Sequence, residues 1–190
     1  MDDSQAAPAV RPPVALGCFG MAAAVVAIVG VVIFGIQYLE SGTSTRVALG
    51  PAASYAPSSI TFEAEHNLYI VRMGDGTFFA LSDLDAANRA KPGRRCRVSL
   101  IPTDDPALPG ILELHRNDFS PRAAGSTAVF RETCNGALYD ATGVRLNGEG
   151  LNLDRHEYSV DDSGRLEVKT AVRHCTRHEG ADYFAPVDCP

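Results

Sequence analysis

The chain begins with a long apolar stretch and continues as short runs in which apolar and polar residues alternate. Residues 14–36 are 23 consecutive positions without a charged side chain. As a helix that rises about 1.5 Å per residue, this stretch would span about 35 Å, enough to cross a hydrocarbon core of about 30 Å. The pattern predicts a single transmembrane helix over residues 14–39, preceded by a short N-terminal tail (1–13).

The residues around the apolar stretch favour a retained anchor over a cleaved signal peptide. A signal peptide starts with a basic region and ends at a small-residue cleavage site. Here the tail has one basic side chain, Arg11, and the stretch ends through Gln37, Tyr38 and Glu40. Arg11 and Arg46 balance each other, so charge does not decide the orientation. Because the tail is short and the remainder is large, we expect a cytoplasmic N-terminus and a C-terminal domain on the periplasmic side of the cell membrane.

The alternating runs predict a series of short strands. Residues 40–59, rich in Pro, Gly and Ser, precede them and are typical of a flexible tether. The clearest hairpins are residues 67–83, which turn at Gly74-Asp75-Gly76, and residues 156–170, which turn at Asp161-Asp162-Ser163-Gly164. Further strands are expected at residues 96–102, 111–116, 127–133 and 137–143. One short helix is expected at residues 83–90. The prediction is an all-β domain, a small antiparallel sandwich or barrel, over residues 60–170.

Composition and motifs exclude several functions. The chain has 17 Lys and Arg against 23 Asp and Glu, a net charge of −6, and it has no basic run. Nucleic acid is therefore not expected as a partner. No G-x-S-x-G, P-loop or H-E-x-x-H string occurs. We assign no catalytic residue, and we expect no catalytic activity of the chain on its own.

Five cysteines occur, and four of them follow the apolar stretch. Cys18 lies inside that stretch, and the others are Cys96, Cys134, Cys175 and Cys189. An even number fits two disulfides in an oxidising compartment, and the sequence alone allows three pairings. Buried free thiols are the alternative. No CxxC pair is present, so a zinc ribbon or a thioredoxin-type site has no support.

The last twenty residues (171–190) form a C-terminal tail after the last expected hairpin. His174 and His178 would share one face of a helical turn and could then bind a metal ion. The alternative is a Cys175–Cys189 disulfide that ties down the chain end. Because Pro, Gly and Asp in the tail disfavour a helix, we expect the disulfide and no metal site.

Two stretches resemble the Rieske iron–sulfur domain of quinol oxidoreductases. The first is TFFALSD (77–83) followed by Cys96, which is similar to the family's A-L-S strand and C-x-H-x-G-C box. The second is residues 130–170, similar to the C-P-C-H-G-S-x-Y-D box and the L-D-R-Y before the last hairpin. Its matching positions are Gly136, Tyr139-Asp140, Gly143, Gly148 and Leu153-Asp154-Arg155. The resemblance implies a Rieske-like β domain with two loops at its tip.

The same resemblance places other residues at all four cluster-ligand positions. A Rieske cluster is held by two Cys thiolates and two His imidazoles. The aligned positions hold Lys91, Gly93, Glu132 and Asn135. The remaining pair, Cys96 and Cys134, matches the family's non-ligand cysteines, which form a disulfide between the two loops. The resemblance therefore implies a Cys96–Cys134 disulfide and a domain that holds no cofactor.

These observations lead to one main hypothesis and two alternatives. The main one is an accessory or structural subunit of a membrane electron-transfer complex, whose partners are the membrane and the other subunits. The first alternative is a working [2Fe–2S] electron carrier with unusual ligands. The second is an unrelated extracytoplasmic β-module that binds a ligand or protein, which would place Cys96 and Cys134 far apart.

Overall fold

A computed structural model describes residues 46–89 and 96–190. The expected N-terminal tail and membrane helix, residues 1–39, lie outside the described residues. Within the described ranges, no helix is both long and apolar enough to cross a membrane.

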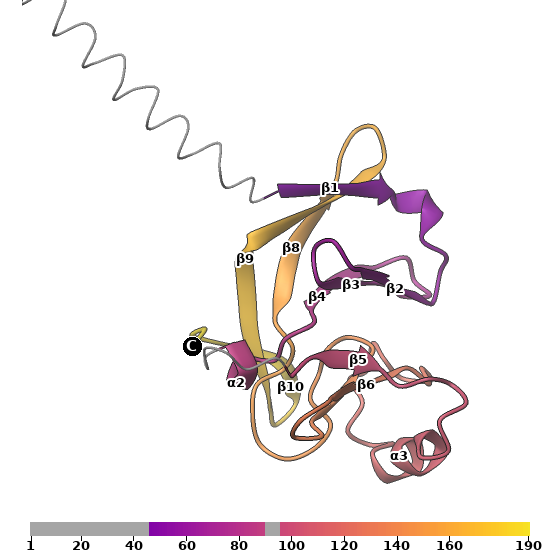
Figure 1. The fold of residues 1–190 in the computed structure, drawn as a ribbon, viewed down its shortest axis with the longest axis vertical. Helices are drawn as coiled ribbons and strands as arrows, with labels where there is room; N and C mark the ends of the chain where they lie inside the picture. Colours follow the sequence, from indigo (N-terminus) through magenta and orange to yellow (C-terminus); the bar gives the residue numbers. More distant parts are fainter. Residues whose placement is uncertain (1–45, 90–95) are drawn as a thin grey trace, which may run out of the picture. The chain divides into compact units, whose positions relative to one another are not determined.

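The described residues form two antiparallel sheets (Figure 1). The large sheet has the order β1-β9-β8-β4-β3-β2, and β10 also pairs with β9. Its strands are β1 (Arg46–Pro51), β2 (Ser59–Glu63), β3 (Leu68–Arg72), β4 (Phe78–Ser82), β8 (Arg155–Val160), β9 (Arg165–Glu179) and β10 (Asp182–Val187). The small sheet, in the order β5-β6-β7, has β5 (Val98–Leu100), β6 (Val129–Glu132) and β7 (Leu138–Asp140). The helices are η1 (Ala52–Ser54), α2 (Ala86–Arg89) and α3 (Leu108–Leu114). The prediction of an antiparallel all-β domain is confirmed.

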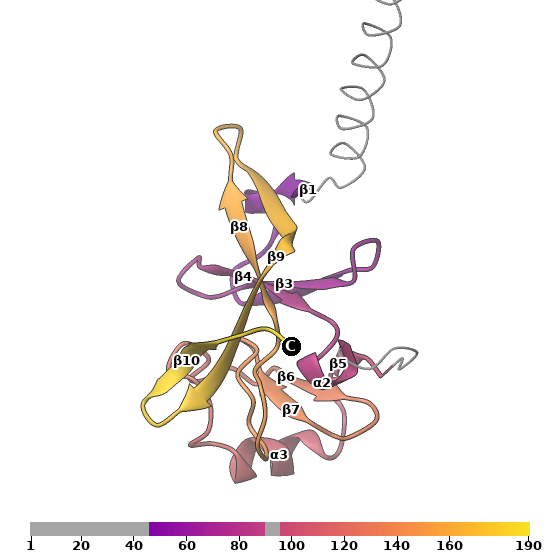
Figure 2. The ribbon, with the colours of Figure 1, turned by 90° about the vertical axis from the view of Figure 1, so that its left-hand side faces the viewer.

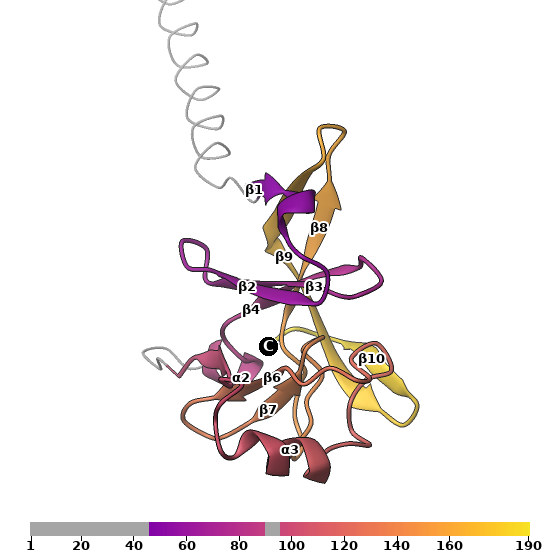
Figure 3. The same ribbon diagram turned by 90° about the vertical axis from the view of Figure 1, so that its right-hand side faces the viewer.

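The main core lies between the two sheets. Tyr69 and Leu81 of the large sheet pack there with Phe130 of the small sheet. The neighbouring residues Ile70 and Ala80 point to the opposite face and pack in a second cluster. Because β3 and β4 are buried on both faces, they are continuous apolar runs rather than alternating ones. Figures 2 and 3 show the small sheet lying between β2–β4 and α3.

Helix α3 covers the outer face of the small sheet, so the predicted strand over residues 111–116 is wrong. Leu108 is buried, and Ile111 and Leu112 are partly buried against the same cluster. Their spacing is that of one helix face. Pro109 lies in the first turn, where a helix needs no N–H donor. The cluster that α3 covers includes Ile101, Val129, Leu138 and Leu146.

The segment predicted as a flexible tether (40–59) is, over residues 46–59, part of the domain. Strand β1 pairs with the first half of β9. Leu49 and Tyr55 are buried in the second cluster. Composition did not predict the pairing of β1 with β9, because the pairing uses backbone groups and β9 lies far from β1 in the sequence.

The C-terminal residues form a hairpin rather than an irregular tail. Strand β9 is 15 residues long and returns as β10. His174 and His178 therefore lie on a strand, where four residues span about 13 Å at about 3.3 Å per residue. That distance is too great for both rings to bind one metal ion. The His178 ring instead stacks on Tyr183, with the ring centroids 4.2 Å apart.

A buried carboxylate organises the loop that follows β7. Asp140 is fully buried, and its Oδ1 accepts hydrogen bonds from the backbone N–H groups of Thr142 (2.8 Å) and Val144 (3.0 Å) and from the Thr142 hydroxyl (2.8 Å). Its Oδ2 accepts one from the N–H of Ser120 at 2.9 Å. Gly143 turns the loop with a φ of +81°. This carboxylate therefore joins the end of the small sheet to the long connection before β6.

Candidate functional site

The turn between β6 and β7 holds two of the residues that the resemblance places at cluster-ligand positions. Glu132 is the last residue of β6 and is fully buried. Its carboxylate accepts hydrogen bonds from the backbone N–H groups of Cys134 (2.8 Å) and Asn135 (2.5 Å). Gly136, with a φ of +71°, completes the turn and donates its N–H to the Glu132 carbonyl at 3.1 Å. The Glu132 side chain thus fills a nest of backbone donors that belong to its own turn.

A disulfide joins this turn to the segment before β5. Cys96 and Cys134 are bonded, with their Cα atoms 5.5 Å apart. Beside them the Thr133 N–H donates to the Arg97 carbonyl at 3.0 Å, and the Arg97 side chain forms an ion pair with the buried Asp83. The pairing is the one that the resemblance implied, and it holds two segments together that are far apart in sequence.

The tip brings three potential ligand groups together. The sulfur atoms of Cys96 and Cys134 and a carboxylate oxygen of Glu132 lie within 4.8 Å of one another. Two further positions that the resemblance aligns with cluster ligands, Lys91 and Gly93, belong to the first loop. They lie outside the described residues.

The tip side chains that the structure describes do not match the donor set of a Rieske [2Fe–2S] cluster. Such a cluster in a Rieske domain needs two thiolates and two imidazoles. The two sulfur atoms are bonded to each other and offer no thiolate. Both oxygens of Glu132 accept backbone hydrogen bonds, and residues 132–137 contain no histidine.

A pocket of about 390 Å³ borders the same turn and includes Asn135 in its wall. Its wall also includes Asp85 and the fully buried Tyr139, which donates its hydroxyl to Asp85 Oδ2 at 3.3 Å. Burial raises the pKa of Tyr139, and the charge of Asp85 raises it further. The other oxygen of Asp85 accepts the N–H of Asn88 in α2 at 2.8 Å. Tyr139 is therefore a neutral donor, and the pair holds α2 against the small sheet.

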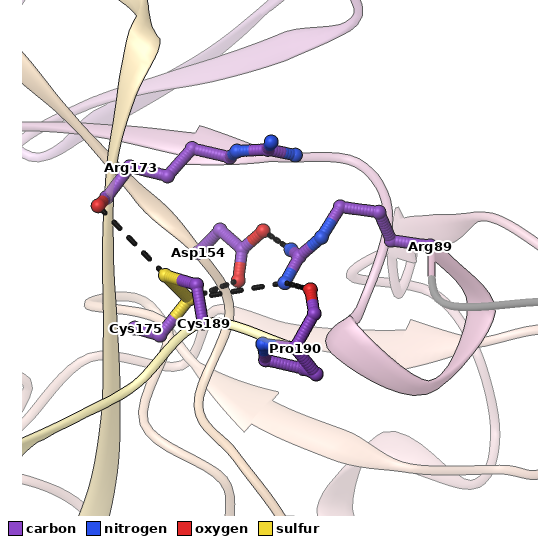
Figure 4. Close-up of a disulfide and its surroundings, with 6 residues drawn as sticks. All are labelled: Arg89, Asp154, Arg173, Cys175, Cys189 and Pro190. Atoms are coloured by element: carbon purple, nitrogen blue, oxygen red, sulfur yellow. Dashed lines mark hydrogen bonds and ion pairs between the residues drawn. A yellow bond between two sulfur atoms is a disulfide. The ribbon is translucent and has the colours of Figure 1, made fainter.

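The second disulfide lies beside a buried ion pair (Figure 4). It joins Cys175 of β9 to Cys189, next to the end of the chain. The Arg89 guanidinium of α2 contacts the carboxylate of Asp154, which is 1% exposed. A terminal nitrogen of Arg89 also donates to the Pro190 carbonyl at 3.4 Å. The C-terminal end is thereby fixed beside α2.

Sequence reasoning missed the buried polar contacts around the tip. Asp83, Asp85 and Arg89 lie in the segment expected to be a plain short helix, yet each contacts a residue from another part of the chain. The sequence did contain a signal for these contacts, because Tyr139 and Asp154 occupy positions that match the Rieske pattern. In the sequence analysis these two residues served only to align the chain with that pattern.

Comparisons with known proteins give a weak likeness. No protein-family model and no curated protein matches the chain. Among solved structures, it is similar to an NADH-dependent nitrite reductase small subunit from Mycobacterium tuberculosis, at 13% identity and a TM-score of 0.35, over 65% of this chain and 92% of that one. A nitrite reductase NADPH small subunit also matches, at 13% identity and a TM-score of 0.32, over 65% and 96% of the two chains. Likeness of this degree carries no argument about function, which rests on the residues of the tip.

The role of Glu132 can be tested by hydrogen exchange. We expect Glu132→Gln to speed amide exchange at Cys134 and Asn135 on the order of tenfold, because the glutamine amide keeps one acceptor oxygen and turns a donor toward the second N–H. The measurement is amide exchange by NMR. The control Glu63→Gln alters a carboxylate that accepts the Tyr55 hydroxyl and should leave both amides unchanged. Unchanged exchange in Glu132→Gln would contradict this role.

Proposed function

We propose that the chain is a Rieske-like domain without a [2Fe–2S] cluster, and that it serves as an accessory or structural subunit of a membrane electron-transfer complex. The observation that carries the proposal is Glu132, whose side chain stands at a ligand position and satisfies the backbone of its own turn. The Cys96–Cys134 disulfide supports it, because it holds the two tip segments together without any metal. In this proposal the scaffold is retained and the cluster chemistry is lost.

The same proposal includes the location of the chain. We propose that residues 14–39 anchor it in the cell membrane and that the domain faces the periplasm. The support is the apolar length of residues 14–36 and the two disulfides, which form and persist in oxidising compartments.

Metal content tests the loss of the cluster. We expect the full chain, purified without chelators, to contain neither iron nor acid-labile sulfide, because the described residues of its tip offer no thiolate or imidazole ligand. The measurement is iron and sulfide per folded chain, with low-temperature EPR after reduction. One cluster per chain would contradict the proposal and favour the electron carrier with unusual ligands.

Anchoring and partners need a separate experiment. Membranes that contain the tagged full chain are washed with alkaline carbonate, treated with protease from the periplasmic side, and extracted with mild detergent. We expect the chain to stay in the membrane, its domain to be accessible, and redox subunits to co-purify in fixed ratio. Release by carbonate would contradict the anchor. A membrane-bound chain without redox partners would favour the unrelated binding module.

A further inference from the structure

The Cys175–Cys189 disulfide joins a buried cysteine to an exposed one. Cys175 of β9 is 3% exposed, whereas Cys189, which follows β10, is exposed to solvent. In thiol–disulfide exchange a thiolate attacks one of the two sulfur atoms, and access helps to decide which one. An incoming thiolate therefore reaches Cys189 more easily, and Cys175 becomes the leaving group.

The surroundings of Cys175 suit a leaving thiolate (Figure 4). A terminal nitrogen of Arg89, on α2, lies 3.8 Å from the Cys175 sulfur. The same guanidinium forms an ion pair with the buried Asp154, whose Oδ1 lies 3.5 Å from that sulfur. A positive charge stabilises a thiolate and a negative charge opposes it, so the ion pair offsets the repulsion from Asp154.

A second arginine adds positive charge near the sulfur. Arg173 precedes Cys175 by two residues on β9, so both side chains leave the same face of the strand. Burial lowers the pKa of Arg89, and the nearby charge of Arg173 lowers it further, against the opposing effect of Asp85. Within residues 46–89 and 96–190, no carboxylate forms an ion pair with Arg173. Because a thiol of lower pKa leaves faster, the two guanidinium groups favour release of Cys175.

We propose that Cys175–Cys189 is a redox-active disulfide that exchanges with a dithiol, in addition to tying down the C-terminal hairpin. One thiolate of the dithiol attacks the Cys189 sulfur and forms a new S–S bond with it, while the bond to Cys175 breaks and Cys175 leaves as a thiolate beside Arg89. The second thiolate of the dithiol then displaces Cys189. The dithiol ends as a disulfide, the two cysteines are reduced, and the two protons of the dithiol pass to the two cysteine sulfurs.

The attacked sulfur is located with glutathione as the probe. The full chain in detergent is treated briefly with excess reduced glutathione, quenched with acid and N-ethylmaleimide, and mapped by mass spectrometry. We expect glutathione on Cys189 and maleimide on Cys175. Equal labelling of the two cysteines, or glutathione mainly on Cys175, would overturn the proposal. The absence of an adduct on either cysteine would overturn it as well, because a redox-active disulfide must react with a small thiol.

A variant tests the role of Arg89. The rate at which dithiothreitol, a dithiol, reduces the Cys175–Cys189 bond is followed by thiol labelling. Arg89→Gln should slow this reduction on the order of tenfold, because the leaving thiolate then faces Asp154 without its cation. A purely structural role predicts the opposite sign, since loosening the contacts around the disulfide would expose it and speed its reduction.

A control and a second variant complete the test. Arg177→Gln removes an exposed arginine of β9 that pairs with Glu179, and it should leave the rate unchanged. If Arg89→Gln does not fold, Arg173→Gln replaces it, because Arg173 is exposed, and it should slow reduction by a smaller factor. Unchanged or faster reduction in the folded Arg89 variant, or in the Arg173 variant in its place, would overturn the proposal.

Discussion

Replacing Cys96 and Cys134 together by serine is expected to lower the free energy of unfolding by about 4 kcal/mol. The two cysteines are 38 residues apart, so the bond removes much conformational entropy from the unfolded chain. It also holds the Glu132 turn against the segment before β5. The measurement is urea denaturation of the full chain and of the double variant under the same conditions.

The second disulfide provides the matched control. Cys175 and Cys189 are 14 residues apart, so removing that bond should cost about 3 kcal/mol, less than the first. Titration of free thiols in the unsubstituted protein checks that both bonds are present. Reactive thiols at Cys96 or Cys134 in that protein, or unchanged stability in their double variant, would contradict the role assigned to the tip disulfide.

Replacing Asp140 by alanine is expected to lower the free energy of unfolding by at least about 4 kcal/mol, because buried backbone donors lose a charged acceptor. The carboxylate accepts N–H groups of Ser120, Thr142 and Val144 in a fully buried site. Water cannot easily replace it there. The measurement is thermal and urea unfolding, and we expect the yield of folded protein to fall as well.

Asp161→Ala is the control for this prediction. The Asp161 Oδ1 also accepts backbone N–H groups, those of Ser163 and Arg165, both at 2.9 Å, but it lies in the exposed β8–β9 turn. The Ser163 hydroxyl bond is the main reason that its pKa is lowered. Because water can take over these bonds, we expect a much smaller loss of stability. Equal losses in the two variants would contradict the importance of burial.

The sequence predicted best the elements that depend on neighbours in the chain. The hairpins over residues 67–83 and 156–170 form as expected, as β3–β4 and β8–β9. Their turn residues and strand runs lie within one short segment, so local chemistry selects the structure. The same reasoning failed for residues 111–116, because a short apolar run is compatible with either a strand or a helix. Packing against the small sheet stabilises the helix α3 there.

Elements that depend on distant partners were not predicted. Strands β1 and β10 show little alternation of apolar and polar residues in the sequence. They form because β9 is long enough to pair with both. At the tip, the resemblance implied the Cys96–Cys134 bond and the position of Glu132. The hydrogen bonds that Glu132 accepts depend on the backbone of a folded turn, which residue types alone do not specify.

The sequence by itself determined the apolar stretch at residues 14–36, the antiparallel class of the domain and the residue types available at the tip. Only the tertiary structure decided that the Glu132 carboxylate turns inward, and that Arg89 contacts both Asp154 and the sulfur of Cys175. The physical reason is the range of the interactions. Periodicity and turn chemistry act between near neighbours in the chain, whereas burial and unpaired charge are set by strands that meet only after folding.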